Sequence, residues 1–164
     1  MRKLIVTLLI LAVIPSFCIA QSRAMENLSE KHEDGFVLMF YHSTLKMLIP
    51  EDNKKMQEVI YGIEKIKLLR VSELAETLSE NETVKSDLRE EGYEEAITMR
   101  HDGNNMIIYI KEKKGITKGA FFLMEEDSSL TVLDLVGEIP IDKLFTLSTE
   151  IDMLTEARGN FLEN

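Results

Sequence analysis

Cysteine and histidine are scarce in this sequence, and tryptophan is absent. Cys18 is the only thiol among 164 residues, and it lies in an apolar N-terminal leader. A chain that loses this leader can form no disulfide and offers no thiol nucleophile or thiolate ligand. His32, His42 and His101 are spread along the chain without an HExxH pairing. Because a zinc site needs three or four converging ligands, we expect no metal and no cofactor.

The motifs of common nucleotide-dependent and hydrolytic enzymes are also missing. The sequence contains no Gly-x-Ser-x-Gly elbow, no P-loop and no dinucleotide fingerprint. Its 19 Lys and Arg residues are outnumbered by 29 Asp and Glu residues, which gives a formal net charge of −10. Since binding to nucleic acid or anionic lipid relies on basic patches, neither is an expected partner. We assign no catalytic residue from the sequence.

The N-terminal leader has the three parts of a secretory signal. Two basic residues precede the apolar run 4–14, and Cys18 and Ala20 place small residues at −3 and −1 before Gln21. This pattern predicts a cleavable signal peptide over residues 1–20. A membrane-spanning helix needs about 20 apolar residues, and this run is shorter. We therefore expect no membrane anchor after cleavage.

Lipid attachment to Cys18 is the alternative interpretation of the leader. That reaction requires a small residue before the cysteine, and Phe17 is bulky, so we interpret Cys18 as the −3 residue of the cleavage site. Loss of the leader removes two basic residues and takes the net charge from −10 to −12, leaving 144 residues. This length fits one domain. We expect an acidic, cysteine-free protein exported to the periplasm or cell envelope of a bacterium.

The first half of the mature chain is predicted to mix short strands and helices. Residues 21–35 are polar and end in glycine, so we interpret them as a flexible lead-in. The apolar run 36–41 and the segment 64–71 are predicted strands. Helical spacing of apolar residues predicts helices over 52–62 and 72–91.

From Tyr93 onward the apolar period changes from 3.6 to 2, which predicts strands joined by short turns rich in Gly, Asn and Asp. The four predicted strands are 93–100, 106–111, 116–124 and 130–139. A final helix begins at Pro140, and the tail 156–164 frays. The predicted fold is α+β, with this four-strand antiparallel meander, one or two N-terminal strands, and helices packed on one face. It forms a single domain over 36–155.

Three segments of the second half resemble a known family. The segments LREEGYEE (88–95), IIYIKEKKG (107–115) and LDLVGEI (133–139) with Lys-Leu at 143–144 are similar in order and spacing to structural motifs of the bacterial domain of unknown function 4252. The resemblance covers roughly 28–155. It implies exported envelope proteins of one compact domain, some encoded near extracytoplasmic sigma factors, and hence a link to envelope signalling. It supplies no catalytic residue.

Acidic residues interrupt two of the predicted strands. Asp134 lies among apolar residues on one face of the last strand, where a buried acid would need a partner. Because antiparallel sheets commonly expose one face to solvent, we interpret the Asp134 face as solvent-exposed. Alternation places Glu95 at an exposed strand end, on the face of Ile97 and Met99 and opposite to Glu94. This placement argues against a catalytic carboxylate pair.

The sequence leaves three functions open. The first is a non-enzymatic binding module whose open sheet face or sheet edge engages an envelope protein. The second is a binder of a small apolar ligand between sheet and helix. The third is a carboxylate-based hydrolase, which needs paired acids in a cleft. The oligomeric state is left open. The candidate ligand or partner surface consists of Phe121, Leu123, Leu133, Asp134 and Leu135.

Overall fold

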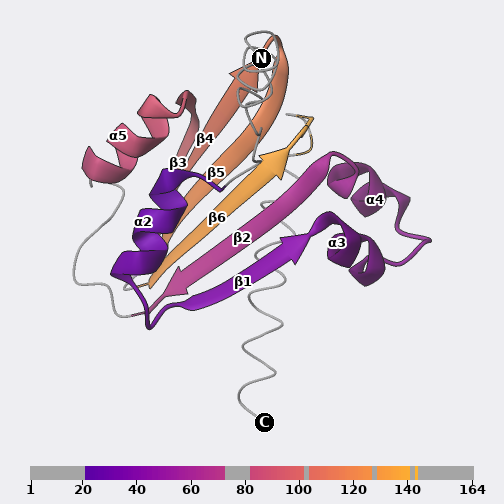
Figure 1. Cartoon of the computed structure of the whole chain (residues 1–164), viewed down its shortest axis with the longest axis horizontal. Coiled ribbons are helices and arrows are strands. Elements are labelled where there is room, and N and C mark those ends of the chain that lie inside the picture. The colour runs from indigo at the N-terminus through magenta and orange to yellow at the C-terminus, as the bar shows by residue number, and fades with distance from the viewer. Residues whose placement is uncertain (1–20, 73–81, 102–103, 127–128, 141–142, 144–164) are drawn as a thin grey trace, which may run out of the picture.

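The structure is a computed structural model of the chain and describes residues 21–72, 82–101, 104–126, 129–140 and 143. The elements are α2 (Arg23–Lys31), β1 (Phe36–Tyr41), α3 (His42–Leu48), α4 (Lys54–Ile60), β2 (Ile63–Val71), α5 (Glu82–Glu90), β3 (Tyr93–His101), β4 (Asn104–Lys113), β5 (Ile116–Glu126) and β6 (Ser129–Gly137). The strands form one antiparallel sheet in the order β1-β2-β6-β5-β4-β3 (Figure 1).

The predicted α+β fold and its C-terminal meander are confirmed. Strands β3 to β6 pair successively, and β2 joins this meander by pairing with β6. Both predicted N-terminal strands therefore belong to the same sheet, with β1 at its edge. The predicted signal peptide, residues 73–81 of the predicted second helix, and most of the predicted final helix with its tail lie outside the described residues.

The two central strands explain the most apolar part of the sequence. Seven of the eleven residues of β5 and eight of the nine residues of β6 are buried, on both faces of the sheet. Strands covered on both sides read as continuous apolar runs. Gly119 lies within β5, and a Cβ there would come within 2.8 Å of the Tyr93 hydroxyl. A tyrosine from β3 thus reaches over β5 because Gly119 has no side chain.

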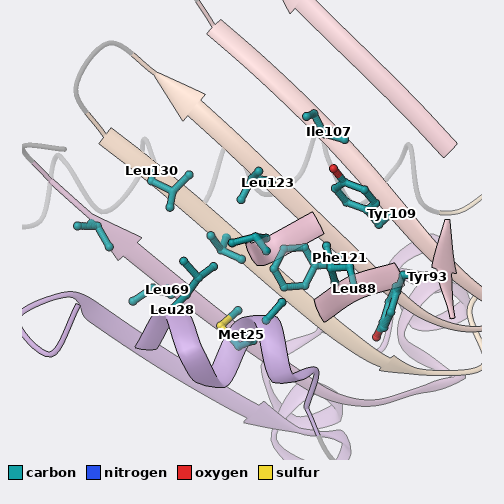
Figure 2. Packing of buried hydrophobic residues seen from close by; sticks show 14 residues of the cluster. Met25, Leu28, Leu69, Leu88, Tyr93, Ile107, Tyr109, Phe121, Leu123 and Leu130 are labelled. Atoms are coloured by element: carbon teal, nitrogen blue, oxygen red, sulfur yellow. The ribbon is translucent and has the colours of Figure 1, made fainter. Parts of the chain in front are cut away.

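Helices α2 and α5 cover one face of the sheet (Figure 1). Residues 21–35 are therefore not a flexible lead-in, because α2 forms there with Ser22 as its N-cap. Ala24, Met25 and Leu28 form a narrow apolar stripe on this otherwise polar helix and are at most 3% exposed. Figure 2 shows this packing. The cluster contains Ala24, Met25, Leu28, Leu69, Val71, Val84, Leu88, Tyr93, Ile107, Tyr109, Phe121, Leu123, Leu130 and Val132.

A second cluster lies on the opposite face of the sheet, as the alternation along β5 and β6 requires. The helices α3 and α4 contribute Leu45, Val59 and Ile60 to it. Helical residues therefore pack against both faces, whereas the sequence predicted helices on one face only. Both helices lie in the connection between β1 and β2 (Figure 1).

Strand β3 contains a bulge that changes which residues share a face. Its register against β4 shifts between Glu95 and Ile97, so alternation is interrupted at Ala96. Glu95 pairs with Tyr109, which belongs to the cluster under α2 and α5, whereas Ile97 packs against the opposite cluster. The prediction that Glu95 shares a face with Ile97 and Met99 was therefore wrong, because an inserted residue reverses the alternation.

Candidate functional site

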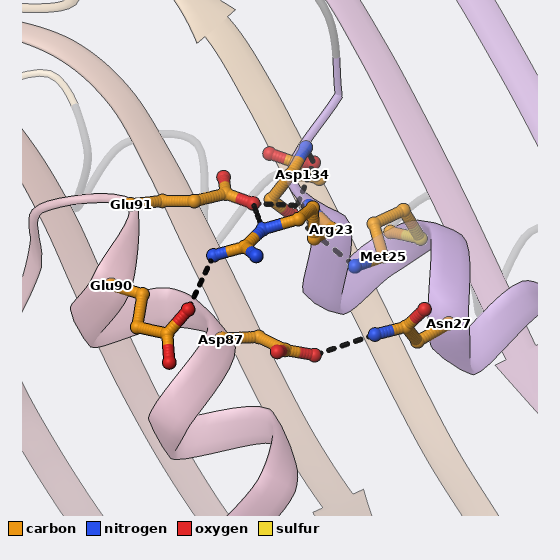
Figure 3. A network of polar contacts seen from close by, with 8 residues as sticks. Arg23, Met25, Asn27, Asp87, Glu90, Glu91 and Asp134 are labelled. Carbon is orange, nitrogen blue, oxygen red and sulfur yellow. Dashed lines mark hydrogen bonds and ion pairs between the residues drawn. The ribbon is translucent and has the colours of Figure 1, made fainter.

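Asp134 lies in the middle of β6 and is completely buried. The interpretation of its face as solvent-exposed was wrong. The face is covered because α2, formed from residues assigned to a lead-in, packs over it. Figure 3 shows the start of α2 beside this carboxylate.

The Asp134 carboxylate accepts two hydrogen bonds from the N-cap of α2. The backbone N–H and the hydroxyl of Ser22 both donate to Asp134 Oδ2, at 2.7 and 2.8 Å. The Ser22 Oγ in turn accepts a bond of 3.2 Å from the Met25 N–H. The side-chain amide of Gln21 donates to the backbone carbonyl of Asp134 at 3.2 Å. The acid thus holds the first turn of α2 against the central strand.

This hydrogen bonding satisfies only half of the carboxylate. Among the residues that the structure describes, Asp134 Oδ1 is buried and has no hydrogen-bond partner, and the same is true of Gln21 Oε1. Burial raises the pKa of the Asp134 carboxyl, the Ser22 and Gln21 hydrogen bonds oppose that rise, and the charge of Glu91 adds to it. A buried acid with one unsatisfied oxygen is costly unless a donor approaches.

Exposed polar contacts surround the start of α2 and join it to α5 (Figure 3). Glu91 Oε1 accepts from the Arg23 backbone N–H at 2.6 Å and from Arg23 Nε at 3.1 Å, and Glu90 Oε2 lies 3.0 Å from the same guanidinium. Further along the helix, Asn27 donates to Asp87 at 2.6 Å. Exposed ion pairs contribute little to the free energy of folding. The main effect of these contacts is therefore to orient α2 relative to α5.

Tyr93 lies near the same carboxylate, and its pKa is raised. Burial raises its pKa, and the negative charges of Asp134 and Glu91 raise it further. The Lys111 ammonium lies 5.5 Å from the centre of the Tyr93 ring. A phenol that stays protonated at high pH is a hydrogen-bond donor or acceptor and a packing group, not a general base.

The arrangement around Asp134 does not resemble a hydrolytic site. A carboxylate-based hydrolase needs a second acid converging on an open cleft, and Asp134 lines neither of two hollows identified on the described surface. Glu94 and Glu95 both line one of these hollows, of about 260 Å³, but both are exposed to solvent. Within the described ranges, no group of three or more His, Cys, Asp or Glu side chains is placed to hold a metal ion.

The structure divides the predicted ligand or partner surface between the two faces of the sheet. Phe121 and Leu123 belong to the cluster under α2 and α5, and Leu133 and Leu135 belong to the opposite cluster. All four are at most 3% exposed, and neither hollow is lined by any of them. They serve as core residues, and only Asp134 of the predicted set lies in a polar environment.

The surface that sequence reasoning missed is strand β1. Five of its six residues are exposed although all six are apolar or aromatic. The apolar run 36–41 predicted a strand, but the pattern gave no indication that the strand is exposed. No charged residue occurs within β1, and its six register pairs with β2 are regular. The length of the run gives no sign of an edge, because six residues are an ordinary strand length.

Neighbouring groups add little further chemistry. His42 Nδ1 lies 2.8 Å from the Ile63 carbonyl, which accounts for one ring nitrogen as a structural contact. His42 also lines the second hollow, of about 250 Å³, with Lys46 and Glu51.

In the described part of the chain, every helix is too short or too polar to traverse a lipid bilayer.

Comparison with known proteins supports a family and no activity. Residues 31–147 match the model of a family described as "Domain of unknown function (DUF4252)". This match spans more than half of the chain and agrees with the resemblance seen in the β3–β6 region. A search of curated proteins gave no match.

Proposed function

The chain belongs to the DUF4252 family, and we propose that it is an exported, non-enzymatic binding protein that engages an envelope protein along the edge strand β1. The leader pattern of residues 1–20 supports export. The observation that carries the binding role is the exposed apolar edge. A place in envelope signalling is part of the same proposal.

The backbone of β1 supports binding by strand addition. β1 pairs with β2 on one side and, among the described strands, has no neighbour on the other side. An edge strand presents unpaired N–H and C=O groups along its free side, which can template an extended segment of another chain. The six residues of β1 match the common length of a strand.

The side chains of β1 support the same mode of binding. Val37, Met39 and Tyr41 are 42%, 40% and 55% exposed, and Phe36 and Leu38 are also exposed on the alternate face. Edge strands of proteins that stay unpaired usually carry charges or bulges that prevent pairing. An exposed apolar edge without either device indicates a surface that is covered in use.

The partner that fits this edge is an extended apolar segment flanked by acidic residues. Met39 and Tyr41 pair across the ladder with Lys67 and Lys65, and the Lys65 ammonium lies 5.7 Å from the Tyr41 ring. These cations stand beside β1 in a chain whose net charge is −10. A second copy of this chain is a less suitable occupant, because two strongly acidic molecules repel each other.

The test compares two methionines of similar exposure on the two edge strands. Met39 on β1 is 40% exposed and Met99 on β3 is 41% exposed. Met39→Glu places an acid opposite Lys67, which is a favourable cross-strand pair within the chain. The same acid repels an incoming segment that is flanked by acidic residues. Met99→Glu is the matched control. Both variants and the wild type are used to capture crosslinked proteins from the envelope of the source cell.

We expect one crosslinked protein to be captured by the wild type and the Met99→Glu variant and lost with Met39→Glu. The captured protein should bind the purified chain through an extended apolar segment. Loss with both variants, or with neither, would remove β1 from the proposal. If crosslinking and mass measurement gave only monomer, or only a pair of identical chains, the proposed partner would be wrong.

A further inference from the structure

The unsatisfied oxygen of Asp134 lies next to the residue that cleavage would expose. Ser22 N–H donates to Asp134 Oδ2 at 2.7 Å, and Gln21 is the residue immediately before it. Adjacent residues have Cα atoms about 3.8 Å apart, so the nitrogen of Gln21 is one residue away from the Ser22 N–H that already donates to this carboxylate. Gln21 is itself buried, at 7% exposure, and its amide donates to the Asp134 carbonyl.

We propose that cleavage after Ala20 completes this site, because the new α-ammonium group of Gln21 becomes the ion-pair and hydrogen-bond donor to Asp134 Oδ1. The inference rests on the export and cleavage proposed above. A signal peptidase adds water across the Ala20–Gln21 peptide bond, so Ala20 leaves as a carboxylate. Gln21 keeps the nitrogen as an amine and takes up a proton.

The surroundings of Asp134 favour this pairing over the alternatives. In the precursor, the nitrogen of Gln21 belongs to a peptide bond and carries no charge. Among the described residues, the buried carboxylate therefore accepts hydrogen bonds only from the neutral donors of Ser22. A cation that reaches Oδ1 would both satisfy that oxygen and offset the cost of burying the charge. The cleaved chain would therefore hold its own N-terminus in the core.

Four other charged or titratable groups face this part of the sheet. The charge of Glu91 raises the pKa of both Asp134 and Tyr93, and the charge of Asp134 also raises the pKa of Tyr93. Arg23 is bound to Glu90 and Glu91, and Lys67 is the register neighbour of Asp134 on β2. No ion pair of Lys67 or Arg23 with Asp134 is found among the described residues, so neither of these side chains fills the place of the ammonium.

One competing reaction is specific to an N-terminal glutamine. The α-amino nitrogen of Gln21 can attack its own side-chain amide carbon, expel ammonia and form a neutral lactam. The lactam N–H could donate one hydrogen bond but could not form an ion pair. An ammonium held by Asp134 is a poor nucleophile, so the proposed pairing protects the N-terminus from this cyclisation.

The experiment uses protein exported and processed from the full-length gene. A matched chain carries one inserted alanine after Ala20, which leaves Cys18 and Ala20 at −3 and −1 and yields a mature chain one residue longer. Mass spectrometry establishes each N-terminus. The rate at which an amine-reactive ester labels the α-amino group is then measured at neutral pH in both folded chains.

We expect the Gln21 amine to be labelled about ten- to a hundredfold more slowly than the amine of the longer chain, which corresponds to one hydrogen bond to a charged group. The Asp134→Asn substitution should abolish this difference. It should lower the folding equilibrium constant of the normal mature chain by a similar factor, and leave that of the longer chain equal or higher, because the longer chain gains nothing from the buried charge.

Several outcomes would overturn the inference. Equal labelling rates in the two wild-type chains, or a Gln21 that is found as the lactam, would each contradict the pairing. If Asp134→Asn does not fold, the comparison of the two wild-type chains still decides the question. A mature chain that starts at another residue would overturn the cleavage and the pairing together, whereas a Gln21 start with a freely reacting amine overturns the pairing alone.

Discussion

The two edges of the sheet differ in the features that protect a strand from pairing. The β3 edge contains a bulge at Ala96 and exposed charged side chains such as Glu94, Glu95 and Arg100. The β1 edge contains neither, and its exposed side chains are apolar. Natural sheets use bulges and charges to block edge-to-edge association. In the part of the chain that the structure describes, the β3 edge therefore carries protection against pairing and the β1 edge does not, which supports the binding role proposed for β1.

The two edge strands are also attached to the rest of the molecule in different ways. β3 is bound to the core by Tyr93, whose ring lies over Gly119 of β5. β1 is attached by its ladder with β2 and by Phe40, which packs against the cluster opposite α2. We expect substitutions in β3 and in the core to change stability, and substitutions in β1 to change binding.

The largest expected effect on stability comes from comparing an alanine substitution in β2 with one in its neighbour β1. Leu69→Ala on β2 removes a completely buried side chain from the cluster under α2 and should lower the free energy of unfolding by about 3 kcal/mol. Leu38→Ala on β1 removes a side chain that is 37% exposed and should cost less than about 1 kcal/mol. Urea denaturation with an unchanged slope measures both. Equal losses would show that β1 is a core strand.

A smaller effect is expected at alkaline pH from the attachment of β3. Burial raises the pKa of Tyr93 in the folded chain. Above the ordinary tyrosine pKa of about 10, the unfolded chain releases this proton and the folded chain keeps it, so stability falls by about 1.4 kcal/mol per pH unit.

The Tyr93→Phe variant should lose less stability than the wild type over this alkaline range. Tyr109, whose pKa is also raised by burial, remains in the variant and leaves part of the loss. Denaturation midpoints at neutral and alkaline pH provide the measurement. Parallel curves for the wild type and Tyr93→Phe would mean that the Tyr93 phenol is not held protonated by the fold.

The smallest expected effect on stability is that of a charge placed on either edge. Met39→Glu and Met99→Glu change side chains that are about equally exposed, so each should alter the free energy of unfolding by less than about 0.5 kcal/mol. Met39→Glu should nevertheless reduce nonspecific aggregation at high concentration, where an unprotected edge can pair despite the repulsion between acidic chains, because it adds the protecting charge that β1 lacks. Light scattering is the measurement, and an equal reduction with Met99→Glu would remove the distinction between the edges.

The sheet could be predicted from the sequence because its signals are local. Period-two alternation and the turns after Lys113 and Glu126 specify the hairpins of β3 to β6, and each hairpin pairs residues close in sequence. The apolar run of β1 likewise specifies a strand. Its position at the edge could not be predicted, because the order of strands depends on pairing between β2 and β6, which are distant in the chain.

The candidate site could be predicted only in part, for the same reason. Asp134 was identified as an acid among apolar residues, but its burial depends on Ser22, which lies 112 positions earlier in the chain. The helix that carries Ser22 has only three buried apolar residues, too few to distinguish it from a polar lead-in by pattern alone. The reversal at Glu95 depends on a bulge, which alternation assumes to be absent.

Site-specific photocrosslinking in living cells tests the binding edge most directly. A photoreactive residue is placed at Val37 on β1 or at Thr98 on β3, both of which are exposed. We expect the probe at Val37 to form one discrete adduct with an envelope protein, and the probe at Thr98 to form none. An adduct from Thr98 alone, or equal adducts from both positions, would contradict the assignment of β1 as the binding edge.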